Sequence, residues 1–232
     1  MSAAITLKVM TSNALRTVFS QLIPGFERAH PVKIDASYDP AKRVQKRLAA
    51  GETADVAVSN LPAIERMISE GILDANTRRE FAHYGIGIAV KAGAAKPDIS
   101  TVEAFKQTLL NARSIACTIE GASGIYFADL IQRLGIADAI NAKASRQPGG
   151  LCAEQLIDGR ADIAIQQVPE LLAAGKGIEL AGLLPAELQK MSVLAAGVFK
   201  SSTEAAAGKA FIDFLATPDA LRTFKAAGFD PI

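Results

Sequence analysis

The stretch at residues 115–135 constrains the fold most strongly, because it reads as a buried strand, a tight loop and a long helix in that order. Residues 115–119 form a short apolar run with one Cys and one Thr, which is typical of a strand buried on both faces. Small residues then interrupt the run, and Ser123 is suited to cap the helix that follows. From Ile125 apolar residues recur at helical spacing, and Gly135 ends the helix.

The loop inside this stretch is a candidate anion site. A Gly/Ser loop that leads into a helix directs several backbone N–H groups at one point, where the helix dipole favours an anion. A plain strand-to-helix turn with a serine cap is the alternative, since such turns occur in every α/β domain.

Strand and helix patterns alternate along the rest of the chain. Three strand–helix pairs precede residue 72, and this order predicts a parallel sheet. A second series follows a glycine-rich strand at 84–90, and two helices end the chain. The other predicted strands lie at 5–10, 31–34, 54–59, 161–166, 180–184 and 193–198, with residues 35–40 read as a loop and the helix at 151–158.

No low-complexity linker separates the two series, so we expect an α/β protein of two lobes, each with a sheet flanked by helices. Lobe 1 is predicted to contain residues 1–83 and 195–232, and lobe 2 residues 84–194. Two crossover strands, predicted at 85–90 and 193–198, should lie side by side and act as a hinge.

Composition narrows the classes of function. Lys and Arg number 25 against 24 Asp and Glu, which argues against a nucleic-acid or membrane-surface partner. No apolar run approaches the roughly 20 residues of a membrane helix. Residues 1–4 run directly into a strand without a leader, so the protein is expected to be cytoplasmic if Met1 is the native start and periplasmic if a leader was removed.

The cysteines and histidines suggest neither a metal nor a cofactor. Cys117 lies in an apolar strand and reads as a small buried hydrophobe. Cys152 begins a helix, where a thiolate is favoured. No Cys/His spacing fits a metal site, and neither His30 nor His83 lies beside a candidate nucleophile.

Five loops that follow predicted strands carry hydrogen-bonding residues. Ligands of open α/β sheets bind beyond the carboxyl ends of strands, so these loops predict a cleft for an anion or polar ligand. Ser12, Ser37, Ala122, Ser123 and Gly149 are expected to line one pocket. The full set of candidate contacts is Thr11, Ser12, Asn13, Ser37, Tyr38, Lys42, Arg43, Ala122, Ser123, Gly124, Arg146, Gly149, Gly150 and Gln166, with Gln167 beside the last of them.

Some of these candidates have a structural alternative. Lys42 and Arg43 either pair with a ligand carboxylate or belong to a solvated helix face that Lys46 and Arg47 continue. Arg146 carries the same two interpretations. Tyr38 is read first as a packing residue with a hydroxyl that can reach a ligand.

Segments along the whole chain resemble the class II periplasmic solute-binding proteins, in particular their molybdate-binding branch. The segments that carry the resemblance are TSNAL, GETADVAVSN, IEGASGIYFADLIQRLGI, LIDGRADIAIQQVPELL, LPAELQKMSVLAAGVF and AFIDFLATPDALRTFKAAGFDP. The resemblance implies the type II periplasmic-binding-protein fold, with a small anion clamped between two lobes of mixed sheets. It also implies a monomer that delivers its ligand to an ABC-transporter permease.

The chain departs from that branch in ways that affect the ligand. Molybdate binders surround the oxyanion with neutral hydroxyl and N–H donors, whereas the second loop here has Lys42 and Arg43 in place of a serine run. Gln166 and Gln167 replace the tyrosine that is usual in the late strand. These changes favour a carboxylate over molybdate.

The same branch includes aconitate isomerase, so an enzyme that moves a proton on an unsaturated tricarboxylate is the rival interpretation. Such an enzyme needs a base beside a substrate carbon. Glu120, Lys42 and Tyr38 are candidates, and the sequence selects none of them.

Overall fold

A computed structural model describes residues 5–232, in which two mixed sheets are each flanked by helices. The predicted entry of residues 1–4 into a strand without a leader lies outside the described residues. Contacts divide the chain into unit 1, made of 1–39, 43–84 and 192–232, and unit 2, made of 40–42 and 85–191. The chain therefore passes from one unit to the other after Tyr84 and again after Met191.

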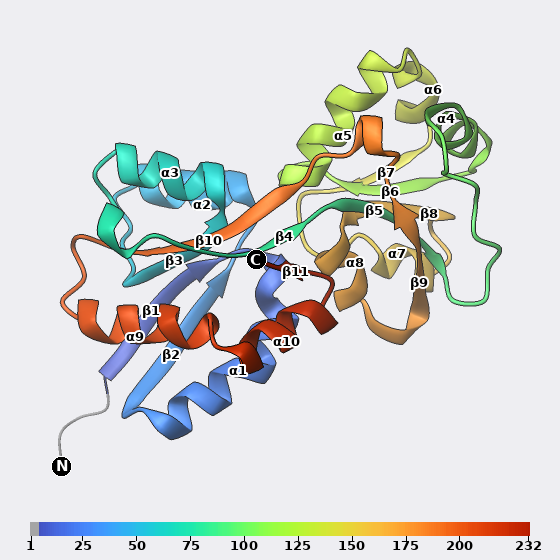
Figure 1. Ribbon diagram of the computed structural model, residues 1–232. Helices are drawn as coiled ribbons and strands as arrows, with labels where there is room; N and C mark the ends of the chain where they lie inside the picture. Colours follow the sequence, from blue (N-terminus) through green and yellow to red (C-terminus); the bar gives the residue numbers. More distant parts are fainter. Residues whose placement is uncertain (1–4) are drawn as a thin grey trace. The chain divides into compact units, whose positions relative to one another are not determined.

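Unit 1 contains a six-stranded sheet with the order β11-β4-β10-β3-β1-β2 (Figure 1). Strand β1 pairs in parallel with β2 and β3, as the alternation of strands and helices predicted, and the remaining pairs are antiparallel. The strands are β1 (Ile5–Thr11), β2 (Val32–Tyr38), β3 (Val56–Asn60), β4 (Arg79–Tyr84), β10 (Ser192–Val198) and β11 (Asp230–Pro231).

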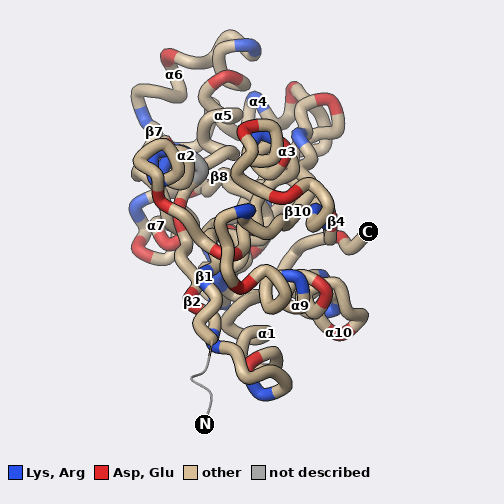
Figure 2. The backbone as a smooth tube through the Cα atoms, turned by 90° about the vertical axis from the view of Figure 1, so that its left-hand side faces the viewer, with Lys and Arg blue, Asp and Glu red and all other residues tan. Residues whose placement is uncertain are grey.

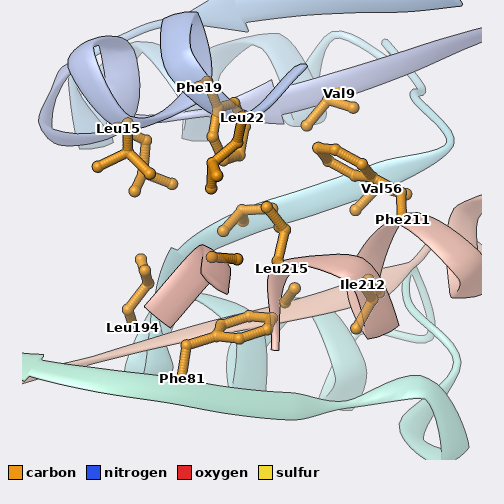
Figure 3. Close-up of a cluster of buried hydrophobic side chains, with 14 of the residues drawn as sticks. Val9, Leu15, Phe19, Leu22, Val56, Phe81, Leu194, Phe211, Ile212 and Leu215 are labelled. Carbon is orange, nitrogen blue, oxygen red and sulfur yellow. The ribbon is translucent and has the colours of Figure 1, made fainter. Parts of the chain in front are cut away.

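Helices cover both faces of this sheet (Figure 1). One face packs against α1 (Arg16–Ala29), α9 (Ala205–Leu215) and α10 (Pro218–Ala226), and the other against α2 (Ala41–Ala49) and α3 (Leu61–Ser69). Figure 3 shows Phe19 and Leu22 of α1 facing Phe211 and Leu215 of α9 across the larger core. Burial of such side chains is worth roughly 1.5–3 kcal/mol each, so this face anchors unit 1.

Unit 2 contains a five-stranded sheet with the order β7-β6-β8-β5-β9. Strand β6 pairs in parallel with β7 and β8, and β5 pairs antiparallel with β8 and β9. The strands are β5 (Ile86–Lys91), β6 (Ile115–Thr118), β7 (Ala144–Gln147), β8 (Ile163–Gln167) and β9 (Ile178–Leu183).

The two faces of this second sheet differ in side-chain size. Large residues pack against α4 (Val102–Asn111), α5 (Ala122–Arg133) and α6 (Ala137–Asn141) on one face. Ala89, Ala116 and Ala164 face the short helices α7 (Glu154–Ile157) and α8 (Val168–Ala173) on the other. Small side chains let these helices approach the strands closely, which brings the first turn of α8 against the sheet.

Four 3-10 turns complete the elements: η1 (Asn13–Leu15), η2 (Ala75–Thr77), η3 (Gly175–Gly177) and η4 (Ala186–Leu188). Across residues 5–232, none of the helices combines the length and the apolar character that crossing a membrane requires.

Several predicted elements were wrong in type or extent. Strand β2 continues to Tyr38, although residues 35–40 read as a loop, because Asp35 and Ser37 occupy the more open face while Ala36 and Tyr38 pack inward. Residues 144–147 form the edge strand β7 rather than a loop. Of the predicted helix at 151–158, only Glu154–Ile157 is α-helical.

The predicted pairing of crossover strands was also wrong. Residues 86–91 form β5 in the sheet of unit 2, whereas β10 pairs with β4 in the sheet of unit 1. The missed strand is β4 (Arg79–Tyr84), in which Phe81, Ala82 and Tyr84 are buried without strict alternation along the strand.

Helix α5 begins flush against the end of β6. A Cβ atom on Gly124 would lie 1.8 Å from the Thr118 carbonyl oxygen, whereas a Cβ atom on Gly121 would meet the Thr118 hydroxyl at 2.7 Å. Only glycine at position 124 therefore permits this approach of helix to strand.

We expect Gly124→Ala to lower the free energy of unfolding by roughly 3 kcal/mol or more, because the clash is with backbone that cannot turn away. Gly25→Ala in α1 is the control, since its Cβ would lie 3.8 Å from Phe214 and would raise stability by roughly 0.5–1 kcal/mol through helix propensity. Urea denaturation of both variants measures the difference. Equal stabilities would contradict the close approach.

Candidate functional site

Parallel strands in each unit end at the same level, so their following loops meet at one edge. In unit 1, Thr11 at the end of β1 lies opposite Tyr38 of β2 and Val58 of β3. We call this edge rim 1 and define it, by position along the chain, as residues 11–16, 37–43 and 59–60, of which 40–42 are counted with unit 2 by their contacts. In unit 2, Thr118 lies opposite Gln147, and β6 and β8 are also in parallel register. Rim 2 is residues 118–124, 147–152 and 166–170.

Two hydroxyl groups of rim 1 are engaged within the protein. Thr11 is buried and donates to the Val58 carbonyl at 2.9 Å. The Ser37 hydroxyl accepts from Arg47 at 3.1 Å and donates to the Val9 carbonyl at 3.5 Å. Of Thr11, Ser12 and Ser37, only Ser12 has a hydroxyl without a hydrogen-bond partner within the described residues. Thr11 and Ser37, at the ends of two neighbouring strands, therefore offer no free hydroxyl to an oxyanion.

Arg47 organises the polar residues beneath α2, a role that the sequence did not reveal. Its guanidinium binds Asp39 and both carboxylate oxygens of Glu52, with Nε 2.8 Å from Oε2. The hydrogen bonds that Arg47 donates to Glu52, followed by the one that it donates to Asp39, raise the Arg47 pKa above its already high value. Arg47 is therefore a permanent, internally neutralised cation, and it lines a 440 Å³ pocket within unit 1 beside Lys8 and Asp35.

Other cations of rim 1 remain exposed. Figure 2 marks the Lys and Arg positions of α2 in blue along the backbone. Arg43 is 60% exposed and lies 3.5 Å from Asp39 Oδ1, while Arg47 binds the other oxygen of the same carboxylate. Lys42 is exposed in the first turn of α2. Arg16, which sequence reasoning missed, is exposed above the Tyr38 ring at 4.4 Å from its centre. A ligand carboxylate has these side chains available as partners.

Tyr38 itself is a packing residue. It packs against the core of unit 1 and makes an edge contact with Phe19. Burial raises the pKa of its phenol, and the charge of Arg16 opposes that shift. The hydroxyl therefore stays protonated at neutral pH and can donate a hydrogen bond but serves poorly as a base.

Rim 2 presents the N-terminus of α5. Gly121 is the N-cap without a side-chain bond, so the predicted serine cap at Ser123 was wrong: Ser123 lies inside the first turn and is fully buried. The hydroxyls of Ser123 and Thr118 are buried and have no hydrogen-bond partner among the described residues. These two unpaired hydroxyl groups lie at the N-terminus of α5, where the first backbone N–H groups of the helix are also free. Together these donors favour the binding of a negatively charged group.

The loop at Gly149 and Gly150 is held by three amide side chains. Gln166 accepts from the Cys152 N–H at 3.0 Å and donates to the Gly150 carbonyl at 2.8 Å. Gln147 donates to the Gly149 carbonyl at 2.9 Å and accepts from Gln155 at 2.8 Å. Gln166 is 1% exposed, so it supports the loop from below and leaves the loop's own backbone to face a ligand.

Arg146 does not join this loop. It lies in β7, and its guanidinium is exposed and donates to the Asn141 side chain at the end of α6. Strand alternation explains the difference, because Gln147 and Arg146 point to opposite faces.

Two buried titratable groups lie behind rim 2. Burial raises the pKa of Glu170, in the first turn of α8, to about 7, while hydrogen bonds from Gln166 and the Gln167 backbone oppose the shift. Burial, followed by the nearby Glu170 charge, raises the pKa of the Cys152 thiol well above its usual range. The thiolate predicted at Cys152 was therefore wrong. Nothing in the sequence pointed to Glu170, since a single Glu in a helix is typical of an exposed position.

Each unit thus gathers part of the predicted set. Rim 1 brings together Thr11, Ser12, Asn13, Ser37, Tyr38 and the start of α2, and rim 2 brings together Ala122, Ser123, Gly124, Gly149, Gly150 and Gln166. Among residues 5–232, no group of three His, Cys, Asp or Glu side chains is placed to hold a metal ion. Contact of both rims with one ligand stays a prediction.

Comparison with known proteins gives consistent matches along the chain. Residues 7–230 match the family described as bacterial extracellular solute-binding protein. An aconitate isomerase from a Pseudomonas species is 31% identical over 233 residues, which cover 98% of this chain and 88% of that protein. The molybdate-binding protein ModA of Escherichia coli K12 is 22% identical over 228 residues, covering 96% and 88% respectively.

The fold is also found among solved structures. The periplasmic molybdate-binding protein of Azotobacter vinelandii matches with a TM-score of 0.76 at 22% identity, over 96% of this chain and 98% of that one. This likeness shows a shared two-lobed α/β architecture.

Glu170 predicts a measurable pH dependence of stability. Its folded pKa of about 7 exceeds the ordinary 4.5, so the folded state holds a proton that the unfolded state releases first. Its contribution is therefore fully present below about pH 4.5 and is lost as pH rises to about 7, by on the order of 3 kcal/mol.

We expect Glu170→Gln, which cannot ionise, to gain stability relative to wild type between pH 5 and pH 8. Denaturant unfolding across this range measures the difference. Parallel stability curves for the two proteins would show that Glu170 titrates normally.

Proposed function

Because the chain belongs to the bacterial extracellular solute-binding protein family, we propose that it binds a small di- or tricarboxylate. It is a solute-binding protein of the molybdate-binding type in family and fold. The proposal concerns the ligand, which we assign to rim 1 and rim 2.

The proposal rests on which side chains of rim 1 are free to bind a ligand and which are bonded within the protein. Thr11 and Ser37 direct their hydroxyls to groups of the protein itself, whereas Arg43 and Arg16 keep exposed guanidinium groups. Neutral hydroxyl and N–H donors suffice for a tetrahedral oxyanion, but separated planar carboxylates are matched by guanidinium forks. Rim 1 therefore favours a carboxylate over molybdate.

Rim 2 supports the same ligand class with neutral donors. The first N–H groups of α5 and the backbone at Gly149 and Gly150 are uncharged donors that can each make a charge-assisted hydrogen bond to a carboxylate oxygen. An arginine that binds one carboxylate and a helix N-terminus that binds another would together orient an extended ligand.

Isomerisation is a second candidate function, and one observation favours it. The chain is 31% identical to an aconitate isomerase but 22% identical to a molybdate-binding protein over similar coverage. Isomerising an unsaturated tricarboxylate takes a proton from one carbon and returns a proton at another, without oxidation or hydrolysis. Glu120 and Lys42 stay candidates for the base, whereas Tyr38 fits less well because its phenol keeps its proton.

The biological setting follows as a proposal from family membership. An extracellular solute-binding protein fits a periplasmic location and delivery to an ABC-transporter permease, and we propose that the chain acts as a monomer. The lobes are proposed to move as 1–83 with 195–232 against 84–194.

Arg43→Ala tests the ligand class. We expect it to weaken binding of trans-aconitate or citrate at least about tenfold, which corresponds to 1.4 kcal/mol, because a charge-assisted fork is lost. Lys46→Ala, on the same helix but in its last turn, is the charge-matched control and should bind as wild type does. Titration calorimetry with these acids and with molybdate measures the effect. Tight molybdate binding that Arg43→Ala leaves untouched would restore an oxyanion ligand.

The isomerase candidate predicts turnover. In D2O, cis-aconitate incubated with wild-type protein should convert to trans-aconitate with deuterium entering at carbon, because the base exchanges its proton with solvent. Proton NMR of the vinyl signals follows the reaction, and Glu120→Gln and Lys42→Met separate the two candidate bases. A carboxylate that binds without any conversion over days would leave the binding function alone.

A further inference from the structure

The amide of Gln166 is fixed in one orientation by the loop that it supports. One end of the amide faces a backbone N–H, that of Cys152, and the other faces a backbone carbonyl, that of Gly150. Reversal of the amide would set N–H against N–H and oxygen against oxygen, and both contacts would be lost. Gln147 holds the Gly149 carbonyl, and the conformation at Gly150, with a φ of +85°, depends on the direction of the buried Gln166 amide.

Glu170 controls that direction. Its carboxyl group is buried and accepts hydrogen bonds from the Gln166 side chain and from the Gln167 backbone N–H. An ionised carboxylate is an acceptor only, so it faces the amide nitrogen of Gln166 and leaves the amide oxygen for Cys152. A protonated carboxyl group gains a donor and competes with the Cys152 N–H for that same oxygen.

We propose that Glu170 is a positioning residue that, through Gln166, holds the Gly149–Gly150 loop in its ligand-binding conformation. The proposal rests on the assignment of this loop to the ligand site. No ligand contact is ascribed to Glu170 itself, and its effect passes through the amide.

Among the ionisable groups near α8, Glu170 is the one whose ionisation changes near neutral pH. The helix packs against β5, β8 and β9. Lys91 of β5 is exposed and donates to the Ile157 carbonyl, Glu179 of β9 pairs with Lys96, and β8 contains no ionisable residue. The Cys152 thiol is the other titratable group nearby, and its raised pKa keeps it neutral. Since Glu170 has a pKa of about 7, its ionisation changes across the neutral range.

Amide hydrogen exchange on the protein without ligand tests the positioning directly. The protection factor of the Cys152 N–H should rise roughly fivefold from pH 6 to pH 8, because its hydrogen bond to Gln166 strengthens as Glu170 ionises. This rise is opposite in direction to the loss of global stability over the same range, so a purely structural role of Glu170 would not produce it. Glu170→Gln should give a protection factor that does not change with pH.

Two further variants complete the test. Glu154→Gln removes an exposed carboxylate of α7 in the same unit and should keep the wild-type pH profile. Glu170→Met should lower the Cys152 protection roughly fivefold at pH 8, and citrate or trans-aconitate affinity should fall with it. A protection factor independent of Glu170 would overturn the positioning role.

The loop measurement separates this inference from the proposed function. Loss of protection in Glu170→Met together with unchanged citrate and trans-aconitate affinity would show that the loop does not serve the ligand, which overturns the inference. Absence of any carboxylate binding by wild type would instead defeat the proposed function, with the exchange data still reporting on Glu170.

Discussion

The parallel backbone ladders impose the constraint on which both rims depend. In each unit, three neighbouring parallel strands end in register, so the residues that follow them share one edge of the sheet. Each exit then leads into a loop or a helix N-terminus with free backbone N–H groups. Backbone hydrogen bonds alone align Thr11, Tyr38 and Val58. Donors that are distant in sequence are therefore brought to the same edge independently of the side chains at these positions. Side chains then decide which of those donors remain available.

The hydrogen-bond donors that remain free for a ligand differ between the two rims for a physical reason. Beside rim 1, Arg47 is neutralised by Glu52 and Asp39, and Arg43 is left with only the second oxygen of the Asp39 carboxylate at 3.5 Å. In rim 2 the side chains that bond directly to the loop at Gly149 and Gly150 are neutral amides, which also bond to one another. Exposed guanidinium groups are therefore found on rim 1, whereas the loop of rim 2 is held by uncharged groups.

Much of the fold could be predicted from sequence, but the partners of polar side chains could not. Apolar spacing at residues 115–135 located β6 and α5, because burial on both faces leaves a continuous apolar run. The same rule failed at Ser37, since a strand with an open face contains polar residues. Arg43 and Arg47 lie one turn apart and look equivalent, yet the left-handed turn at Gly51 returns Glu52 beside Arg47 alone. The position of Glu52 beside Arg47 depends on this turn of the backbone, and the helical spacing of residues in the sequence does not predict it.

Glu170 extends this argument to the ligand site. A buried carboxyl group without a cation costs stability, and it is tolerated where its hydrogen bonds fix something of use. Here those bonds reach Gln166 and the start of α8, and Gln166 in turn holds the two backbone groups that set the loop. A methionine of similar length would fill the space without the desolvation cost but would leave the amide free to reverse. The buried carboxyl group thus lowers global stability but favours one conformation of the Gly149–Gly150 loop. A rim that binds its ligand with backbone N–H groups needs such a fixed loop conformation.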